Sequence, residues 1–245
     1  MADKRMDPLE RALFEGALPG EADDLDAKAA KRIATLVRGA LKERAPDTPI
    51  IHVESIEPSP GQRRTGLAIV NDNMPFLVDS VTNALTARGM GIHRLLHPIV
   101  SVERTRGGRL KSLHAANGGP SHEQARESII YIEADRVGAR GRSDLAAELA
   151  IVLDDVRAAV RDWQEMTAAM KDAGDSLADA KISAPAAEVI EAKAFLDWLV
   201  DDNFTLLGYA AYRFRGALDD PTLEPQAEAG LGLLSDPEFP LWRGA

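Results

Sequence analysis

The sequence contains no cysteine among its 245 residues, which excludes disulfides, thiol nucleophiles and cysteine-ligated zinc or iron–sulfur centres. Aromatic residues are few, at 5%, and no segment approaches the roughly 18 consecutive apolar residues that a membrane-spanning helix requires. The N-terminus carries basic residues without an apolar stretch behind them, so it does not resemble a secretory signal. These absences predict a cytoplasmic protein with no membrane partner.

Basic residues are in the minority, because 29 Lys and Arg stand against 39 Asp and Glu and give a net charge of −10. A chain of this sign repels nucleic acid overall, so no nucleic-acid partner is expected. Hydrophobic residues at 45% and charged residues at 28% are typical of a soluble globular protein. At roughly 150 residues per domain, the length predicts one domain and part of a second.

The apolar pattern divides the chain into four parts. We predict an N-terminal helical segment over 1–48, a strand-rich domain over 49–168, a polar linker over 169–185 and the truncated start of a second α+β domain over 186–245. In the second part the expected order is strand, strand, helix, strand, candidate strand, strand, helix. This order predicts an α+β fold, with an antiparallel sheet and both helices on one face.

The first helix of this domain has recognisable ends. Asn71, Asp72 or Asn73 is expected to cap it, with Pro75 in its first turn. The run 88–91 contains two glycines and is expected to end it.

Three later segments also carry local expectations. The extended run 92–103 is predicted to be an edge strand or a bulged one, because Pro98 cannot donate to a sheet ladder. A long helix of about five turns is expected to begin near Ser143 as its cap. Near the C-terminus, 187–200 is predicted to be helical and 204–214 to be a strand.

The familiar catalytic and cofactor motifs are not found. His93 and His97 are four residues apart on a predicted strand, about 13 Å, which is too far for two ligands of one metal ion. Gly89 and Gly91 follow a helix and precede a strand, the reverse of the order in a dinucleotide loop. Basic residues around the predicted hairpin tip either blunt a sheet edge or dock an acidic partner; they are Arg104, Arg106, Arg109 and Lys111.

The stretch 66–93 stands out: a strand, a polar loop, a helix, a glycine stop and a second strand. The amides of a first helical turn, together with polar groups of such a loop, can hold a small carboxylate. The same arrangement can equally be scaffold alone, and the residues leave both interpretations open.

This stretch resembles an ACT domain, a small regulatory module with a ferredoxin-like sheet. More narrowly, Asn71-Asp-Asn-Met-Pro-Phe-Leu-Val-Asp-Ser-Val81 and Gly91-Ile-His-Arg-Leu-Leu-His-Pro98 resemble the N-terminal region of the large bacterial NAD-dependent glutamate dehydrogenases. The segments 127–133 and 195–209 are similar to that family too. The resemblance implies a parent enzyme that converts L-glutamate, NAD and water to 2-oxoglutarate, ammonia and NADH, with its catalytic domain far downstream. It implies no catalytic residue, cofactor or metal in this segment.

The resemblance also implies a ligand loop, with one departure. ACT loops usually carry glycine at the helix start, whereas this chain has Pro75 and Phe76 there. The candidate ligand-binding residues are Asn71, Asp72, Asn73, Met74, Phe76, Leu77, Gly91 and His93. The expected partners are downstream domains of the same chain, further copies in a homo-oligomer and an amino-acid effector, and Phe76 favours assembly over effector binding.

Overall fold

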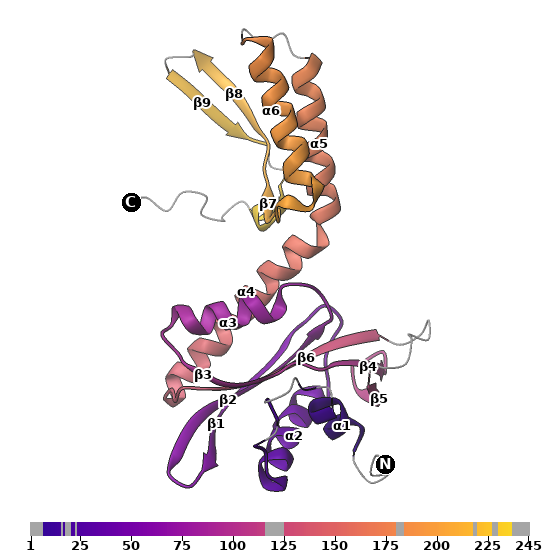
Figure 1. Ribbon diagram of the computed structural model, residues 1–245, viewed down its shortest axis with the longest axis vertical. Helices are drawn as coiled ribbons and strands as arrows, with labels where there is room; N and C mark the ends of the chain where they lie inside the picture. The colour runs from indigo at the N-terminus through magenta and orange to yellow at the C-terminus, as the bar shows by residue number, and fades with distance from the viewer. Residues whose placement is uncertain are drawn as a thin grey trace. The chain divides into compact units, whose positions relative to one another are not determined.

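Strands of the N-terminal part of the chain form one antiparallel sheet that is covered by helices on both faces (Figure 1). The computed structural model describes residues 7–15, 17, 21–22, 24–115, 125–179, 184–217, 220–226 and 230–236. It contains two units, Met1–Leu153 and Asp154–Ala245, each packed around its own contacts.

The first unit consists of α1 (Pro8–Glu15), α2 (Ala27–Leu41), β1 (Ile50–Ser59), β2 (Gln62–Asp72), α3 (Leu77–Ala87), β3 (Ile92–Leu96), β4 (Ile99–Arg104), β5 (Leu110–Ala115), β6 (Ala125–Ala134) and the beginning of α4 (Ala139–Arg161). The strand order is β1-β2-β6-β4-β5, and β3 also pairs with β6. Strand β1 therefore forms the edge of the sheet beside β2. In the sequence it comes before the unit formed by β2 and α3. Among the described residues, α4 is not followed by a further strand of this sheet.

Strand β6 joins the sheet together. On one side it pairs with β2 from Thr65↔Ala134 to Asp72↔Glu127. On its other side β4 pairs with its first half and β3 with its second half. Between β3 and β4 the Pro98 carbonyl accepts a hydrogen bond from the Ile129 amide at 3.0 Å.

The expected edge run over 92–103 is thus two strands. Strand β3 has a register irregularity between Ile92 and Arg94, as a bulged strand would. Strand β4 lies between β6 and β5, so the prediction of an edge is wrong for that half. Pro98 sits at the break, where its missing donor does not interrupt either ladder.

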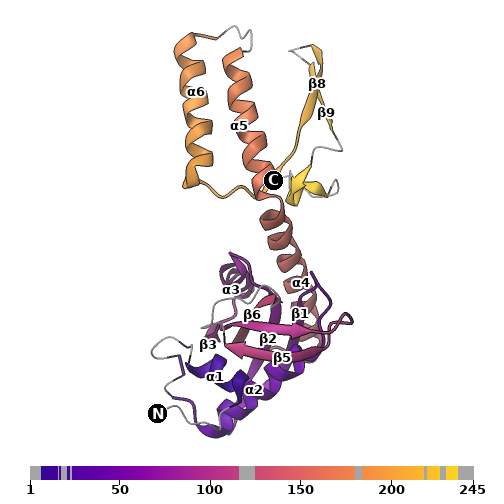
Figure 2. The same ribbon diagram turned by 90° about the vertical axis from the view of Figure 1, so that its right-hand side faces the viewer.

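Helices α3 and α4 lie on one face of the sheet and α1 and α2 on the other (Figure 2). This confirms the α+β class with two helices on one face, preceded by N-terminal helices. The buried residues of α3 are Leu77, Val81 and Leu85, and those of α4 in this unit include Leu145, Leu149 and Leu153. The opposite face holds the cluster in which Ile33 and Val37 of α2 pack with Val70, Ile129 and Tyr131 of the sheet. None of the described helices is long and apolar enough to cross a membrane.

Two expected helix starts are corrected by the structure. Helix α3 begins at Leu77 with Phe76 as its N-cap, and none of Asn71, Asp72 and Asn73 caps it; the first two belong to β2. Helix α4 begins at Ala139, one turn before Ser143, and the Arg142 amide already donates to the Gly138 carbonyl. The glycine stop is confirmed, since Gly89 has φ +70° after the last turn of α3.

The second unit contains α5 (Trp163–Asp179), α6 (Ala186–Trp198), a π turn over Leu199–Asn203, β7 (Gly208–Tyr209), β8 (Tyr212–Ala217), β9 (Asp220–Pro225), β10 (Leu231–Gly232) and a 3₁₀ turn over Leu233–Ser235. Its strands pair as β8 with β9 and as β7 with β10. The predicted helix after 186 is confirmed, whereas the predicted strand over 204–214 is divided between β7 and β8. Of the linker predicted over 169–185, the part up to Asp179 is helical and belongs to α5, whereas residues 184–185 lie outside any helix.

Candidate functional site

The loop between β2 and α3 has a strained backbone. Phe76 adopts φ +68° and ψ −1°, the left-handed conformation that glycine adopts readily and aromatic residues rarely do. Its side chain is 46% exposed. The loop is fixed beside β6, because the Asn73 amide donates to the Arg126 carbonyl at 3.0 Å, and α3 follows at once, since the Ser80 amide donates to the Phe76 carbonyl. The position where ACT loops usually carry glycine therefore keeps a glycine-like backbone while it presents an aromatic ring.

A cavity of about 530 Å³ lies against this loop. It is lined by the loop and first turn of α3, by β3 and by the N-terminal segment; the residues are Glu21, Met74, Pro75, Phe76, Leu77, Val78, Asp79, Leu95 and His97. The His97 imidazole lies 2.8 Å from the Ser128 hydroxyl through Nε2. Desolvation lowers the pKa of His97, and the Glu21 carboxylate opposes that shift. The lining thus combines apolar side chains with a neutral imidazole and two carboxylates.

Asp72 points to a different place, a buried cluster of charges at the end of β2. Its carboxylate accepts a hydrogen bond from Arg44 at 2.6 Å. Arg44 also donates to Glu127 at 2.9 Å, and Arg104 donates to both oxygens of Glu127 at 2.8 and 2.7 Å. Burial alone would lower the pKa of Arg44, but the bonds to Asp72 and Glu127 raise it. The positive charges of the two arginines equal the negative charges of the two carboxylates in this cluster. A cavity of about 290 Å³ adjoins it.

A second buried carboxylate lies at the other end of β6. Glu133 is 1% exposed at its side chain and forms ion pairs with Arg32 at 3.2 Å, Arg64 at 3.1 Å and Arg94 at 3.9 Å. The Tyr131 hydroxyl donates to Glu133 at 2.9 Å, and burial with this neighbouring carboxylate strongly raises the pKa of Tyr131.

The two clusters together hold α2 and the segment that follows it against the sheet. Arg32 of α2 pairs with Glu133, and Arg44 beyond the end of α2 pairs with Glu127. From Arg32 to the end of α2 at Leu41 the chain rises roughly 14 Å, and three further residues lead to Arg44. The six steps from Glu127 to Glu133 span roughly 20 Å in a strand. The spacings match, so α2 runs antiparallel to β6 and is fixed near both ends.

Gly91 and His93 lie at the far end of α3 from the loop. The Gly91 amide donates to the Asp135 carboxylate at 2.8 Å, and Nε2 of His93 lies 2.8 Å from the other oxygen of that carboxylate. The Gly91 amide, followed by His93, lowers the pKa of Asp135. Helix α3 has 11 residues, about 16 Å of rise, and it separates this pair from Phe76.

The structure therefore divides the eight predicted site residues into three groups. Met74, Phe76 and Leu77 line the cavity beside the loop. Three others lie at the end of β2 and just beyond it, away from the residues that line the cavity: Asn71 is buried in β2, Asp72 is bound to Arg44, and Asn73 is exposed. Gly91 and His93 meet Asp135 elsewhere. Within the described ranges no group of three or more metal-ligating side chains comes together.

Sequence reasoning missed the residues that complete the cavity and the charge clusters. Leu95 of β3 and His97 just beyond the end of β3 line the cavity, and period-two alternation after Gly91 could have placed both on one face. Arg104, assigned to an exposed hairpin tip, is only 11% exposed and binds Glu127. The exposed pair at that hairpin is Lys111 with Glu103, at 3.0 Å. Nothing in the sequence distinguishes buried Glu127 or Glu133 from surface carboxylates, apart from their place at both ends of an apolar strand.

Comparisons with known proteins give a consistent result. Residues 11–149 match the family model described as glutamate dehydrogenase, ACT1 domain. The chain is 35% identical over 171 residues to an NAD-specific glutamate dehydrogenase of Pseudomonas aeruginosa, covering 69% of this chain and 10% of that protein. It is 34% identical over 199 residues to the protein of the same name from Halomonas elongata, covering 80% and 12%. A third, from Mycobacterium tuberculosis, is 28% identical over 171 residues. The matched region is about a tenth of the length of these relatives.

Proposed function

This chain belongs to the family of the glutamate dehydrogenase ACT1 domain, and from that premise we propose that it is a regulatory and assembly segment of an NAD-dependent glutamate dehydrogenase that does not catalyse the reaction itself. The parent reaction is the conversion of L-glutamate, NAD and water to 2-oxoglutarate, ammonia and NADH. The segment acts in the cytoplasm, and its partners are downstream domains of the same polypeptide and further copies of it. NAD belongs to the parent enzyme and not to this segment.

The observation that carries the assembly role is the conformation of Phe76. A left-handed aromatic residue costs about 1–2 kcal/mol relative to glycine at the same backbone angles. Such strain persists only where the surrounding structure enforces it, and here the ring it presents is 46% exposed. An exposed aromatic ring on a fixed loop is a suitable anchor for a neighbouring subunit or domain.

Two measurements test this function. Incubation of the purified 245-residue chain with L-glutamate and NAD should yield no NADH, and turnover by this chain would contradict the non-catalytic role. Multi-angle light scattering over a concentration series should give a mass that rises above 26.4 kDa. Phe76→Ser should reduce that mass toward the monomer value, and the exposed Leu223→Ser serves as its control. A wild-type chain that stays monomeric throughout would refute self-association.

A second candidate function is binding of an amino-acid effector in the cavity beside the loop. It is favoured by the start of α3, whose first amides have no side-chain cap. These amides can hold an α-carboxylate, and Glu21 and Asp79 in the cavity lining can face an α-ammonium group. Titration calorimetry with the common amino acids tests this function. Heat that saturates at millimolar concentration and disappears in Leu95→Trp, which fills the cavity, supports it; silence refutes it.

A further inference from the structure

The outer edge of β1 is an unpaired strand edge within the described part of the chain. Strand β1 pairs with β2 from Ile50↔Val70 to Ser59↔Gln62 and has no strand on its other side. An exposed strand edge presents a row of backbone donors and acceptors that can pair with another strand. Residues Ile50–Ile56 of this edge precede the register irregularity of the hairpin, so they offer a regular stretch for pairing.

This edge lies in a groove between two helices. One cavity of about 410 Å³ is bounded by α2 and β1, and a second of about 610 Å³ is bounded by β1 and the first two turns of α4. The two cavities share Leu36, His52 and Glu54, so they flank the same strand. Gly39 of α2 lies close enough to His52 that an added Cβ would touch its ring at 3.5 Å. The groove therefore has β1 along it and a helix on each side.

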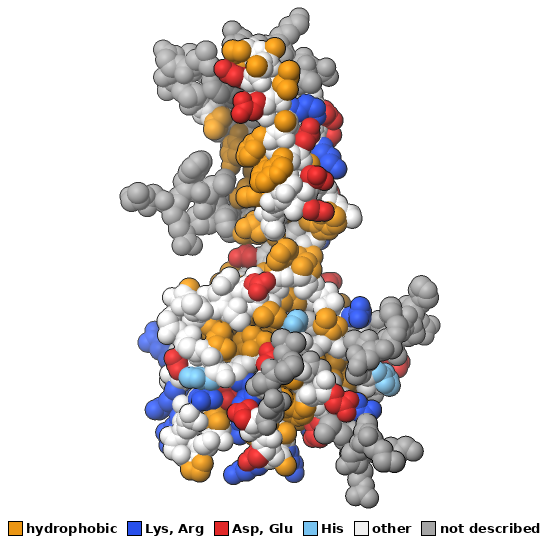
Figure 3. All heavy atoms as spheres, in the orientation of Figure 1, with side chains coloured by type: hydrophobic (Ala, Val, Ile, Leu, Met, Phe, Trp, Pro, Cys, Tyr) orange, Lys and Arg blue, Asp and Glu red, His pale blue; other side chains and the backbone are white. Residues whose placement is uncertain are grey.

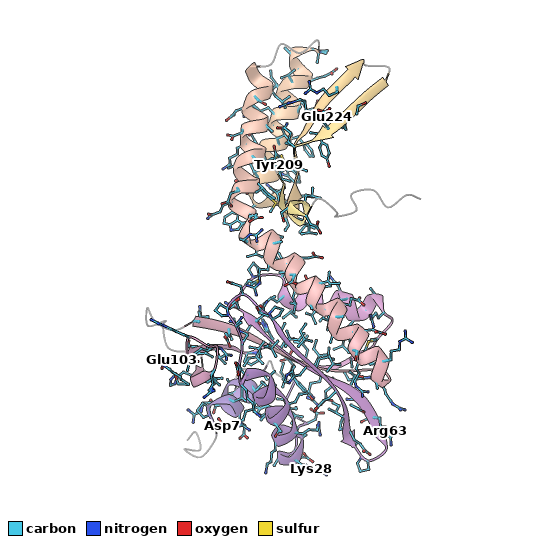
Figure 4. The ribbon with its side chains drawn as sticks, turned by 180° about the vertical axis from the view of Figure 1, so that it is seen from behind. Asp7, Lys28, Arg63, Glu103, Tyr209 and Glu224 are labelled. Carbon is cyan, nitrogen blue, oxygen red and sulfur yellow. The ribbon has the colours of Figure 1, made fainter. Side chains whose placement is uncertain are left out.

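Positive charges without carboxylate partners line this groove. Lys28 and Lys31 line it from α2, and Arg142 lines it from α4. In the parts of the chain that the structure describes, none of the three forms an ion pair, in contrast to Arg32 beside them, which pairs with Glu133. Basic side chains gather over the β1–β2 hairpin and α2 (Figure 3). Lys28 lies in the first turn of α2 (Figure 4). Glu54 is the one carboxylate among the residues that line the two cavities.

We propose that this groove binds an acidic, extended peptide segment, which adds to the sheet as a strand beside β1. The backbone of the segment would pair with the free edge of β1, and its alternate side chains would point toward α2 and toward α4. Glutamate or aspartate side chains of the segment would meet Lys28, Lys31 and Arg142. In a chain of net charge −10, a site that concentrates cations without carboxylate partners selects for such a partner.

The charges also distinguish this partner from a second copy of the same edge. Two β1 strands paired about a two-fold axis would bring both sets of Lys28 and Lys31 to one interface. Like charges placed together oppose association. An acidic extended segment is therefore the occupant that the groove fits.

Fluorescence anisotropy with a labelled peptide of alternating glutamate and valine, about eight residues long, tests the proposal on the 245-residue chain. We expect this peptide to bind at least about tenfold more tightly than its lysine and valine counterpart, with an affinity that falls as salt is added. On binding, hydrogen exchange should show new protection of the alternate amides within Ile50–Ile56 that face away from β2. The double variant Lys28→Glu with Lys31→Glu should weaken binding at least about tenfold, whereas the exposed Lys171→Glu should leave it unchanged.

A backbone-blocked peptide separates strand addition from simple charge attraction. The same glutamate and valine peptide, N-methylated at every residue, keeps its charge but has no backbone N–H on either edge with which to pair along β1. Loss of binding by this peptide supports the proposal. Equal binding of the methylated and unmethylated peptides, protection confined to other strands, or no anisotropy change up to about 1 mM peptide would each overturn it.

Discussion

The Arg44 guanidinium and the Glu127 carboxylate lie 2.9 Å apart inside the first unit, with side chains only 4% and 0% exposed. They come from distant parts of the sequence, one just beyond α2 and the other from the central strand β6. Charges this deeply buried are tolerated because each has partners, including Arg104 and Asp72. Their geometry makes the N-terminal helices an integral part of the sheet domain.

Glu127→Ala should be strongly destabilising, because it leaves Arg44 and Arg104 buried without this carboxylate. We expect a loss of about 3–5 kcal/mol in the unfolding free energy of the first unit, measured by hydrogen exchange of the β2 and β6 amides. Glu103→Ala breaks an exposed pair with Lys111 and should cost about 0–1 kcal/mol. Equal effects of the two substitutions would contradict the role assigned to Glu127.

Phe76→Gly and Phe76→Ala both remove the exposed ring, but only glycine relieves the left-handed backbone. The glycine variant should be more stable than the alanine variant by about 1 kcal/mol. Hydrogen exchange of the first amides of α3 reports this difference locally. If the alanine variant were the more stable, the strain assigned to Phe76 would be disproved.

Gly108 and Gly61 both have positive φ, +82° and +78°, in different surroundings. A Cβ at Gly108 would collide with the Arg44 carbonyl, whereas a Cβ at Gly61 would meet no atom. Gly61→Ala should therefore cost about 1–2 kcal/mol from backbone strain alone. Gly108→Ala should lower the free energy of unfolding by more than about 3 kcal/mol, because it also displaces the segment after α2. Urea titration followed by circular dichroism measures the loss for each variant.

Asp135 should make the stability of the first unit depend on acidity. The Gly91 amide and then His93 lower the pKa of this carboxyl, and Arg64 adds a smaller attraction. Its contribution is thus fully present above the unfolded pKa, near 3.8, and is lost as pH falls through the lowered folded value. The melting temperature of Asp135→Asn should lie below that of the wild-type chain at pH 6 and approach it near pH 3. Asp144→Asn, an exposed control, should show no such convergence.

Periodicity and turn chemistry predicted much of the fold. The stripe in α3, the glycine stop at Gly89, and the apolar strand β6 each depend on neighbours in the sequence, and each is confirmed. The extended run predicted over 92–103 gave no sign that it would divide at Pro98, nor that β4 would lie inside the sheet. Strand order depends on pairings between distant segments, which local patterns do not encode.

The candidate site was predicted less well, for a similar reason. The sequence placed Asp72 in a ligand loop because Asn71-Asp-Asn73 precedes a helix. Its carboxylate is instead bound to Arg44, a residue that periodicity had no means of bringing there. The left-handed backbone at Phe76 was hidden as well, because an aromatic residue gives no signal for positive φ.

The place of β6 in the sheet has a consequence during synthesis. It is the last strand of its sheet to leave the ribosome, yet β2, β3 and β4 all pair with it. The nascent chain must therefore carry three strands with unsatisfied edges until their common partner emerges, and pairings at such long sequence separation form slowly. We expect this unit to complete its sheet only after β6 has emerged.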